Sequence, residues 1–192
     1  MASNTAKRQD GRQCVLGKRT MKYMQGVING KWIVSFDWIE QCNKQWRWVP
    51  EEPYELSGDM NHGITDAPRR ARESLRDCKP KLFRKFSFCF QDSYPDKYPS
   101  TAVLKHLVTM GGGKVLAGSA KHRRRGVSNS NGFVLCAPDL MLPDANCIYQ
   151  QCGLEPLSLM WVLDCISLYR TMPMDTFKLR HVDISPTPSL ST

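Results

Sequence analysis

The sequence predicts an α/β protein made of two related repeats, each a small parallel sheet flanked by helices. One observation is a short apolar run, Trp32–Val34, that leads directly into an amphipathic helix, as a buried strand followed by a helix does. The second is a recurrence at an offset of 123 residues: Ser35, Trp38 and Cys42 return as Ser158, Trp161 and Cys165. This offset is too long for a solenoid repeat and suits two small domains in tandem.

Composition limits the class of protein. The chain has 192 residues, of which 41% are hydrophobic, enough for a packed core in one ordinary domain or two small ones. It has no apolar run of about 18 residues and no signal-peptide pattern at Met1, so we expect a soluble, intracellular protein without membrane contact. The net charge of +9 indicates an acidic partner, which is a phosphorylated peptide, a nucleic acid or an acidic protein surface.

The sequence favours a binding module over an enzyme. The eight cysteines form no C-x-x-C pair and several lie in apolar runs, so we expect buried free thiols, with no metal and no cofactor. The four histidines are scattered, and there is no G-x-S-x-G motif, phosphate-binding loop or obvious carboxylate pair.

The first half of the chain is expected to begin with an irregular basic tail over residues 1–18. A helix follows from about Arg19 to Gly30, because Met21, Met24, Val27 and Ile28 form an apolar stripe. The strand at 32–34 and the helix that carries Trp38 complete a partial first domain, residues 19–55. Residues 56–80 have linker composition, and their Arg69, Arg70 and Arg72 are expected on a solvated face, with a partner or an importin as the other reading.

The second domain is expected over residues 81–180, followed by a tail at 181–192. Phe86, Phe88 and Phe90 alternate as in a strand, and a helix over 99–110 ends at Gly111–Gly113, which form a tight turn. These glycines follow a helix, so they do not form a phosphate cradle. The predicted order is strand, helix, strand, strand, helix, strand, helix. Four residues are expected to be structural: Trp38, Trp161, Gly111 and Gly112.

This order, with a glycine-rich turn after the first helix and W-x-x-x-C in the last, resembles the BRCT family over about residues 18–180. Arg19–Tyr23, Gly30–Ser35, Ala67–Ser74 and Trp161–Asp164 are similar to one tandem BRCT pair of that family. Pro80–Phe83 and Leu107–Gly113 look more like a paralogue that also carries a RING domain. The resemblance implies an N-terminally truncated first repeat, without its first strand, first helix and two further strands.

The resemblance also implies a function: reading phosphoserine-x-x-phenylalanine peptides of phosphorylated DNA-repair proteins in the nucleus, during the DNA damage response, as in tumour suppressors. Any ubiquitin-ligase activity or pairing with a RING/BRCT partner would use regions outside this chain. Lys22 matches the phosphate-binding lysine, Arg19 the arginine that contacts the peptide backbone, and Asp164 its acidic partner. The hydrophobic pocket for the aromatic residue is matched by Met21, Met24 and Leu163, with Tyr98 nearby.

Read without the resemblance, Arg19 and Lys22 are typical of a solvated surface, and the methionines and Leu163 of a core. The family's phosphate-binding serine and glycine fall in the missing strand, and Lys97 and Met160 replace polar or acidic groups. The alternative function is therefore a basic module that binds nucleic acid or chromatin without reading phosphoserine. With its sheet incomplete, the segment 1–55 is expected to be loosely ordered, whereas 81–180 should fold alone.

Overall fold

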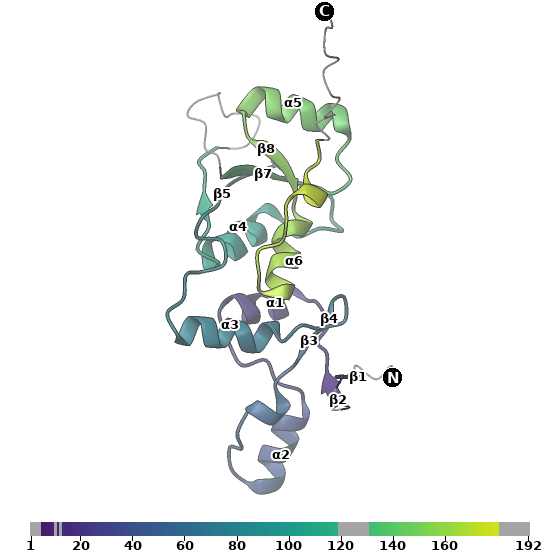
Figure 1. Cartoon of the computed structure of the whole chain (residues 1–192), viewed down its shortest axis with the longest axis vertical. Coiled ribbons are helices and arrows are strands. Elements are labelled where there is room, and N and C mark those ends of the chain that lie inside the picture. The colour runs from purple at the N-terminus through teal and green to yellow at the C-terminus, as the bar shows by residue number, and fades with distance from the viewer. Residues whose placement is uncertain (1–4, 10, 12, 119–130, 181–192) are drawn as a thin grey trace, which may run out of the picture.

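The computed structural model describes residues 5–9, 11, 13–118 and 131–180. The elements follow one long axis, with α5 (Leu142–Cys152) at one end and α2 (Asp37–Gln45) at the other (Figure 1). Among the described residues, none of the helices is both long enough and apolar enough to cross a bilayer. The predicted tail at 181–192 and the basic run at 121–125 lie outside the described ranges.

The second repeat has the predicted order of elements and a four-stranded parallel sheet, so the α/β fold class is confirmed. The strands lie in the order β6-β5-β7-β8. Their bounds are β5 (Ser87–Phe90), β6 (Lys114–Val115), β7 (Gly132–Cys136) and β8 (Glu155–Ser158). The remaining helices of this repeat are α4 (Thr101–Met110) and α6 (Met160–Leu168).

Alternation along the strands gives the sheet two apolar faces. Phe88, Phe133 and Leu135 belong to the large core, which also contains the buried residues of α4 and α6. Cys89 and Val134 point the other way, into a smaller cluster that Cys152 of α5 closes. Both faces are covered by helices, as a parallel sheet requires.

The glycine turn after α4 allows a close approach of two segments. Gly112 has φ +81°, and a Cβ on Gly111 would lie 2.4 Å from the Phe83 ring. The Phe83 N–H donates to the Gly111 carbonyl at 2.7 Å, so the segment before β5 packs directly on this turn. Glycine is required here for space at position 111 and for backbone conformation at position 112.

The two repeats share hydrogen bonds at the same offset of 123 residues. The Trp38 indole N–H donates to the Val49 carbonyl, as that of Trp161 does to the Met172 carbonyl, each at 2.9 Å. The same two residues donate their backbone N–H to the helix cysteine of their repeat, Val49 to Cys42 at 3.4 Å and Met172 to Cys165 at 3.2 Å. The repeat inferred from three residue types is therefore a repeat of structure.

Backbone features follow the same offset. Helices α2 and α6 each end at a residue in the left-handed region of backbone conformation, Trp46 (φ 55°) and Tyr169 (φ 40°). A short 3₁₀-helix follows each, η1 (Glu52–Tyr54) and η3 (Asp175–Phe177). The isolated antiparallel bridge Val34–Glu55 has its counterpart in Leu157–Lys178.

The repeats differ in what covers the tryptophan. Trp161 is 0% exposed and lies against Phe83, Phe86 and Phe88, with ring centroids 5.2 to 6.1 Å away. Trp38 is only half-buried and stacks on the exposed Trp48 at 5.4 Å. The segment 32–34 forms a single bridge instead of a sheet strand, and no parallel sheet exists in the described part of the first repeat. A tryptophan that fixes its helix onto its own sheet is thus present in the second repeat only.

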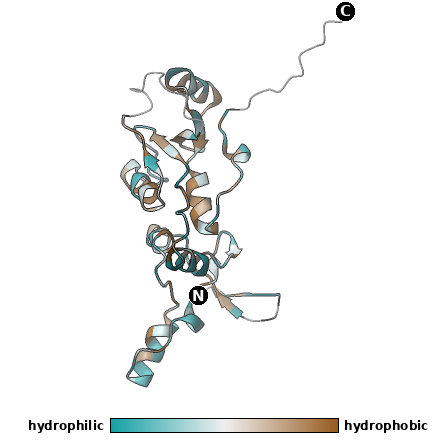
Figure 2. Ribbon diagram, turned by 60° about the vertical axis from the view of Figure 1, so that its left-hand side comes forward, coloured by the Kyte–Doolittle hydropathy of each residue, from teal (hydrophilic) through white to brown (hydrophobic). Residues whose placement is uncertain are grey.

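Helix α1 (Met21–Ile28) belongs to the first repeat by sequence and to the second by packing. Its N-cap Thr20 accepts from the Tyr23 N–H at 3.2 Å. Its buried face, including Met24 and Val27, is part of the large core with α4 and α6. Hydrophobic residues are concentrated in α6 at the centre of the molecule, whereas α3 (Ala67–Arg76) is mostly hydrophilic (Figure 2).

Two segments are more regular than predicted. The expected irregular tail contains the hairpin of β1 (Thr5–Lys7) and β2 (Gln13–Val15). The expected linker contains a second hairpin, β3 (Gly58–Asp59) with β4 (Gly63–Ile64), and α3. Ala67 and Ala71 of α3 are fully buried, and the helix packs on α1 and α6. Small residues set between arginines give little hydrophobic pattern, which is why composition suggested a linker.

The cysteines are all free. Six are buried, as predicted, whereas Cys78 and Cys147 are exposed.

Within the described part of the chain, we expect limited proteolysis to remove the α2 unit, residues 31–55, before the other segments. Phe36, Trp46 and Trp48 are 75 to 95% exposed, and this unit lacks the sheet that covers its counterpart, so it should open locally. The resistant core should retain α1 and α3 in addition to residues 81–180, because both helices pack in the interface between the repeats. Mass spectrometry of the fragments checks this. A resistant core that starts near residue 80 would show that packing in the interface does not protect α1 and α3 from cleavage.

Candidate functional site

The predicted site lies where α1 meets α6. Arg19, just before α1, forms an ion pair through Nη2 with Asp164 Oδ1 of α6, and its Nε donates to Ser167 Oγ at 2.9 Å. The two paired side chains are 11% and 18% exposed. The pairing of Arg19 with Asp164 was predicted from the resemblance, and the contact is present. This contact joins residues 145 apart in sequence, one from each repeat.

Lys22 is in the first turn of α1 and is exposed to solvent. The first backbone N–H groups of a helix lack intrahelical acceptors and attract anions. Lys22 and these amides therefore give the start of α1 groups that attract an anion, beside the largely buried side chain of Arg19.

The predicted pocket residues divide into core and surface. Met24 is fully buried, Leu163 is nearly so, and Met24 Sδ accepts a weak hydrogen bond from Ser167 Oγ at 3.8 Å. Met21 is half-buried at the edge of the same core. Only Met21 of these three presents substantial apolar surface to a ligand.

Tyr98, before α4, is also half-buried against the large core. Its ring lies 5.1 Å from the Lys97 ammonium, which pairs with Asp139 at 2.8 Å. The Lys97 ammonium therefore places a positive charge near the Tyr98 ring, and the Asp139 carboxylate offsets that charge. The Asp139 pKa is held below its usual value by the hydrogen bond from Lys97.

The β3–β4 hairpin adds two residues that the sequence did not indicate, His62 and Asp59. His62 Nε2 lies 3.6 Å from Asp164 Oδ1, and its Nδ1 lies 3.5 Å from Asp59 Oδ1. Asp59 is fully buried, and its Oδ1 accepts from the backbone N–H groups of Asn61 and His62 at 2.9 and 3.0 Å. Their segment read as a linker, so no signal in the sequence distinguished them from solvated residues.

Tyr23 of α1 lies beside this hairpin with its hydroxyl buried. Burial raises the Tyr23 pKa well above its usual value, and the Asp59 carboxylate raises it further. Tyr23 Oη and Asp59 Oδ2 have no hydrogen-bond partner in the described part of the chain. The phenol is therefore neutral at physiological pH.

The arginine cluster of α3 is engaged in contacts within the chain. Arg72 forms a bidentate pair with Glu55 at 2.9 and 3.2 Å and lies over the Trp32 ring. Arg70 donates to the carbonyl groups of Thr65 and Leu168, and Arg69 pairs with Glu73 at 3.4 Å. The prediction of a solvated face is therefore wrong for Arg72, which is the most buried of the three.

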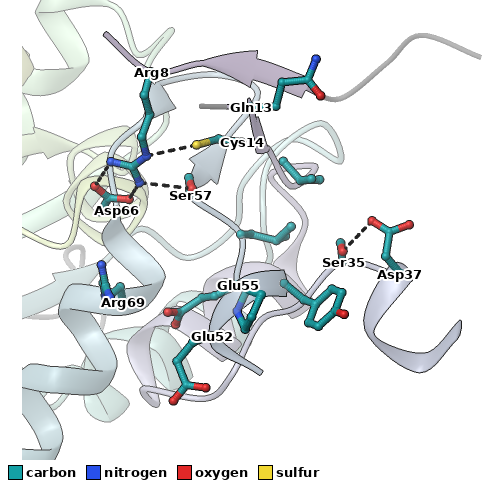
Figure 3. A pocket seen from close by; sticks show the side chains of 14 residues that line it. Arg8, Gln13, Cys14, Ser35, Asp37, Glu52, Glu55, Ser57, Asp66 and Arg69 are labelled. Carbon is teal, nitrogen blue, oxygen red and sulfur yellow. Dashed lines mark hydrogen bonds and ion pairs between the residues drawn. The ribbon is translucent and has the colours of Figure 1, made fainter. Parts of the chain in front are cut away.

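A pocket of about 510 Å³ lies away from this site, between the first hairpin and segment 52–57 (Figure 3). Arg8 spans one wall, where it binds Asp66 in a bidentate pair and donates to Ser57 Oγ at 3.3 Å and Cys14 Sγ at 3.1 Å. The hydrogen bond to Asp66 raises the Arg8 pKa. Because Arg8 is used in these contacts, it holds the first hairpin against the β3–β4 segment and offers little to a ligand.

No protein-family model matches the chain. Among curated proteins, the Breast Cancer Susceptibility 1 homologue of Arabidopsis thaliana is 38% identical over 98 residues, which is 51% of this chain. BRCA1-associated RING domain protein 1 of A. thaliana is 29% identical over 81% of the chain. The mouse breast cancer type 1 susceptibility protein homologue is 29% identical over 86%. The matched regions span 10%, 24% and 9% of these relatives.

A solved structure shows the same fold. The crystal structure of the fifth and sixth BRCT domains of Schizosaccharomyces pombe Brc1 superposes with a TM-score of 0.56 at 19% identity. It covers 79% of this chain and 74% of that one, and therefore both repeats. The chain has the tandem BRCT fold and is homologous to the BRCT-containing breast cancer type 1 susceptibility proteins and BRCA1-associated RING domain proteins.

Proposed function

We propose that the surface at the start of α1 and along α6 binds phosphoserine-x-x-phenylalanine peptides of DNA-repair proteins. The module then acts as a non-catalytic scaffold in the DNA damage response, in the nucleus. The observation that carries this proposal is the Arg19–Asp164 pair, which joins the two repeats next to the exposed Lys22.

In this proposal the phosphate binds at the start of α1. The Lys22 ammonium and the free backbone N–H groups of the first turn donate charge-assisted hydrogen bonds to its oxygens. A phosphoserine carries a charge of about −1.5 to −2 at pH 7, so this end of the helix favours it over serine.

The residue three places after the phosphoserine is read at the junction of the repeats. Arg19, fixed by Asp164 and Ser167, presents its remaining donors to the peptide backbone. Met21 supplies exposed apolar surface for an aromatic side chain, while Met24 and Leu163 form the floor beneath it. A phenylalanine that buries its ring here gains the transfer free energy of that surface.

We expect Lys22→Ala to weaken binding of a phosphoserine-x-x-phenylalanine peptide about 10- to 100-fold, because a hydrogen bond to a charged group contributes about 1.5 to 3 kcal/mol. Isothermal titration calorimetry measures this. Lys44→Ala, which removes an exposed lysine from α2, is the matched control and should leave the affinity unchanged.

Three further results bear on the proposal. The unphosphorylated peptide should not bind, and unchanged affinity in Lys22→Ala would refute the phosphate site. Nucleic-acid binding that falls steeply with salt and ignores phosphatase treatment would favour the basic module instead. The α3 arginines do not favour that outcome, because they contact acidic side chains or carbonyl groups.

A further inference from the structure

The imidazole of His62 lies between two carboxylates that belong to different parts of the fold. Asp59 is on its own hairpin, and Asp164 is on α6. Asp164 is also the partner of Arg19, so His62 and Arg19 approach the same oxygen, Oδ1. The hairpin thus reaches the residue that positions the proposed peptide-binding arginine.

The charges around His62 do not balance when its ring is neutral. Asp59 and Asp164 contribute two negative charges, and Arg19 contributes one positive charge. Tyr23 faces Asp59 from α1, but its raised pKa keeps it neutral, so it compensates neither carboxylate. A buried carboxylate is costly without a matching positive charge or sufficient hydrogen bonds, and Asp59 Oδ2 has no partner among the described residues.

Only the protonated imidazole of His62 offers an N–H to both Asp59 and Asp164. A neutral imidazole has one N–H and one lone pair, so it donates to one carboxylate and turns a lone pair toward the other. An imidazolium has N–H groups on both nitrogens and donates to both. Its Nδ1, which lacks a hydrogen-bond partner among the described residues, then turns an N–H toward Asp59 Oδ1, 3.5 Å away.

We propose that His62 is a positioning residue of the surface formed by α1 and α6, which in its protonated form bridges Asp59 and Asp164 and so holds the hairpin against α6 and Asp164 against Arg19. Discrimination at the third residue after the phosphoserine then strengthens as the pH falls. This last consequence depends on the proposed function, whereas the bridge itself does not. Because only the imidazolium donates to both carboxylates, lower pH favours the bridge and higher pH weakens it.

The bridge is tested in the free protein by NMR titration over about pH 5.5 to 8. The amide resonances of Asp164 and Ser167 should shift together with the ring resonances of His62. In His62→Gln, which is neutral and keeps a donor and an acceptor, they should no longer titrate in this range. His106→Gln is the matched control, because His106 is exposed on α4, and it should titrate like the wild type. Amide shifts that persist in His62→Gln, or that are absent in the wild type, would overturn the bridge.

The positioning role is tested by calorimetry with two phosphopeptides that carry phenylalanine or alanine at the third residue. The ratio of their affinities is used because the phosphate, with a second pKa near 6, titrates equally in both. This ratio should be about fivefold larger at the acidic end of the range than at the basic end. The change should vanish in His62→Gln and persist in His106→Gln.

The outcomes separate the two proposals. If neither peptide binds at any pH, the proposed function fails, and the NMR titration still decides the bridge. If both peptides bind and their affinity ratio does not depend on pH, His62 has no positioning role although the phosphopeptide site stands.

Discussion

Trp161→Ala is expected to lower the free energy of unfolding by about 3 to 5 kcal/mol, a large part of the stability of a domain of this size. The side chain is fully buried between three phenylalanine rings and its indole N–H holds the Met172 carbonyl, so truncation leaves a cavity and an unpaired buried acceptor. Urea denaturation followed by circular dichroism measures the loss.

The internal repeat supplies the control for this prediction. Trp38 occupies the same position in the first repeat and makes the same hydrogen bond, to Val49, but its ring is half-exposed. Trp38→Ala should therefore cost only about 1 to 2 kcal/mol. Should Trp161→Ala fail to fold, Trp161→Phe keeps much of the packing and should still cost more than Trp38→Phe. Equal losses at the two positions would contradict the difference in burial.

Arg19→Gln is expected to destabilise the protein by about 3 kcal/mol, because it leaves the Asp164 carboxylate largely buried without its counter-charge. Asp164→Asn in the same background should restore part of the loss, since the stranded charge is then removed. The exposed pair Asp175–Lys178 is the control, and Asp175→Asn should leave stability nearly unchanged. Chemical denaturation of Arg19→Gln, Asp164→Asn, the double variant and Asp175→Asn measures these effects, and strictly additive losses in the two single variants and the double variant would show that the pair is not coupled.

The same pair should also affect specificity. Asp164→Ala should weaken binding of a phosphopeptide with phenylalanine at the third position more than one with alanine there, because it releases Arg19. An equal loss for both peptides would mean that Asp164 supports the fold without reading that residue.

The second repeat could be predicted from sequence because its pattern and its burial agree. The alternating Phe86, Phe88 and Phe90 and the glycines after α4 need only local rules. The offset of 123 residues, inferred from three residue types, also relates the indole-to-carbonyl hydrogen bonds of Trp38 and Trp161. Composition and spacing were enough to predict an element wherever the residues that form it are close in the sequence.

The features that the sequence did not predict depend on contacts between segments that are far apart in the chain. Helix α3 has few apolar residues because it packs through Ala67 and Ala71, and its arginines find Glu55 and the end of α6. His62 and Asp59 matter only because a hairpin brings them to Asp164. The first hairpin is tied down by Arg8 and Asp66, 58 residues apart. Local propensity does not contain such pairings.

The contacts of the first repeat's strand–helix unit have a consequence for the order of folding. The indole of Trp38 and the thiol of Cys42 bind Val49, 11 and 7 residues away, and these bonds form without any sheet around them. Closing such short loops is fast and loses little entropy, whereas Arg19 must find Asp164 across 145 residues. The local bonds of the unit at 31–55 should therefore form early on the folding pathway, although the unit opens easily once folded, and the interface between the repeats should be among the last features to appear.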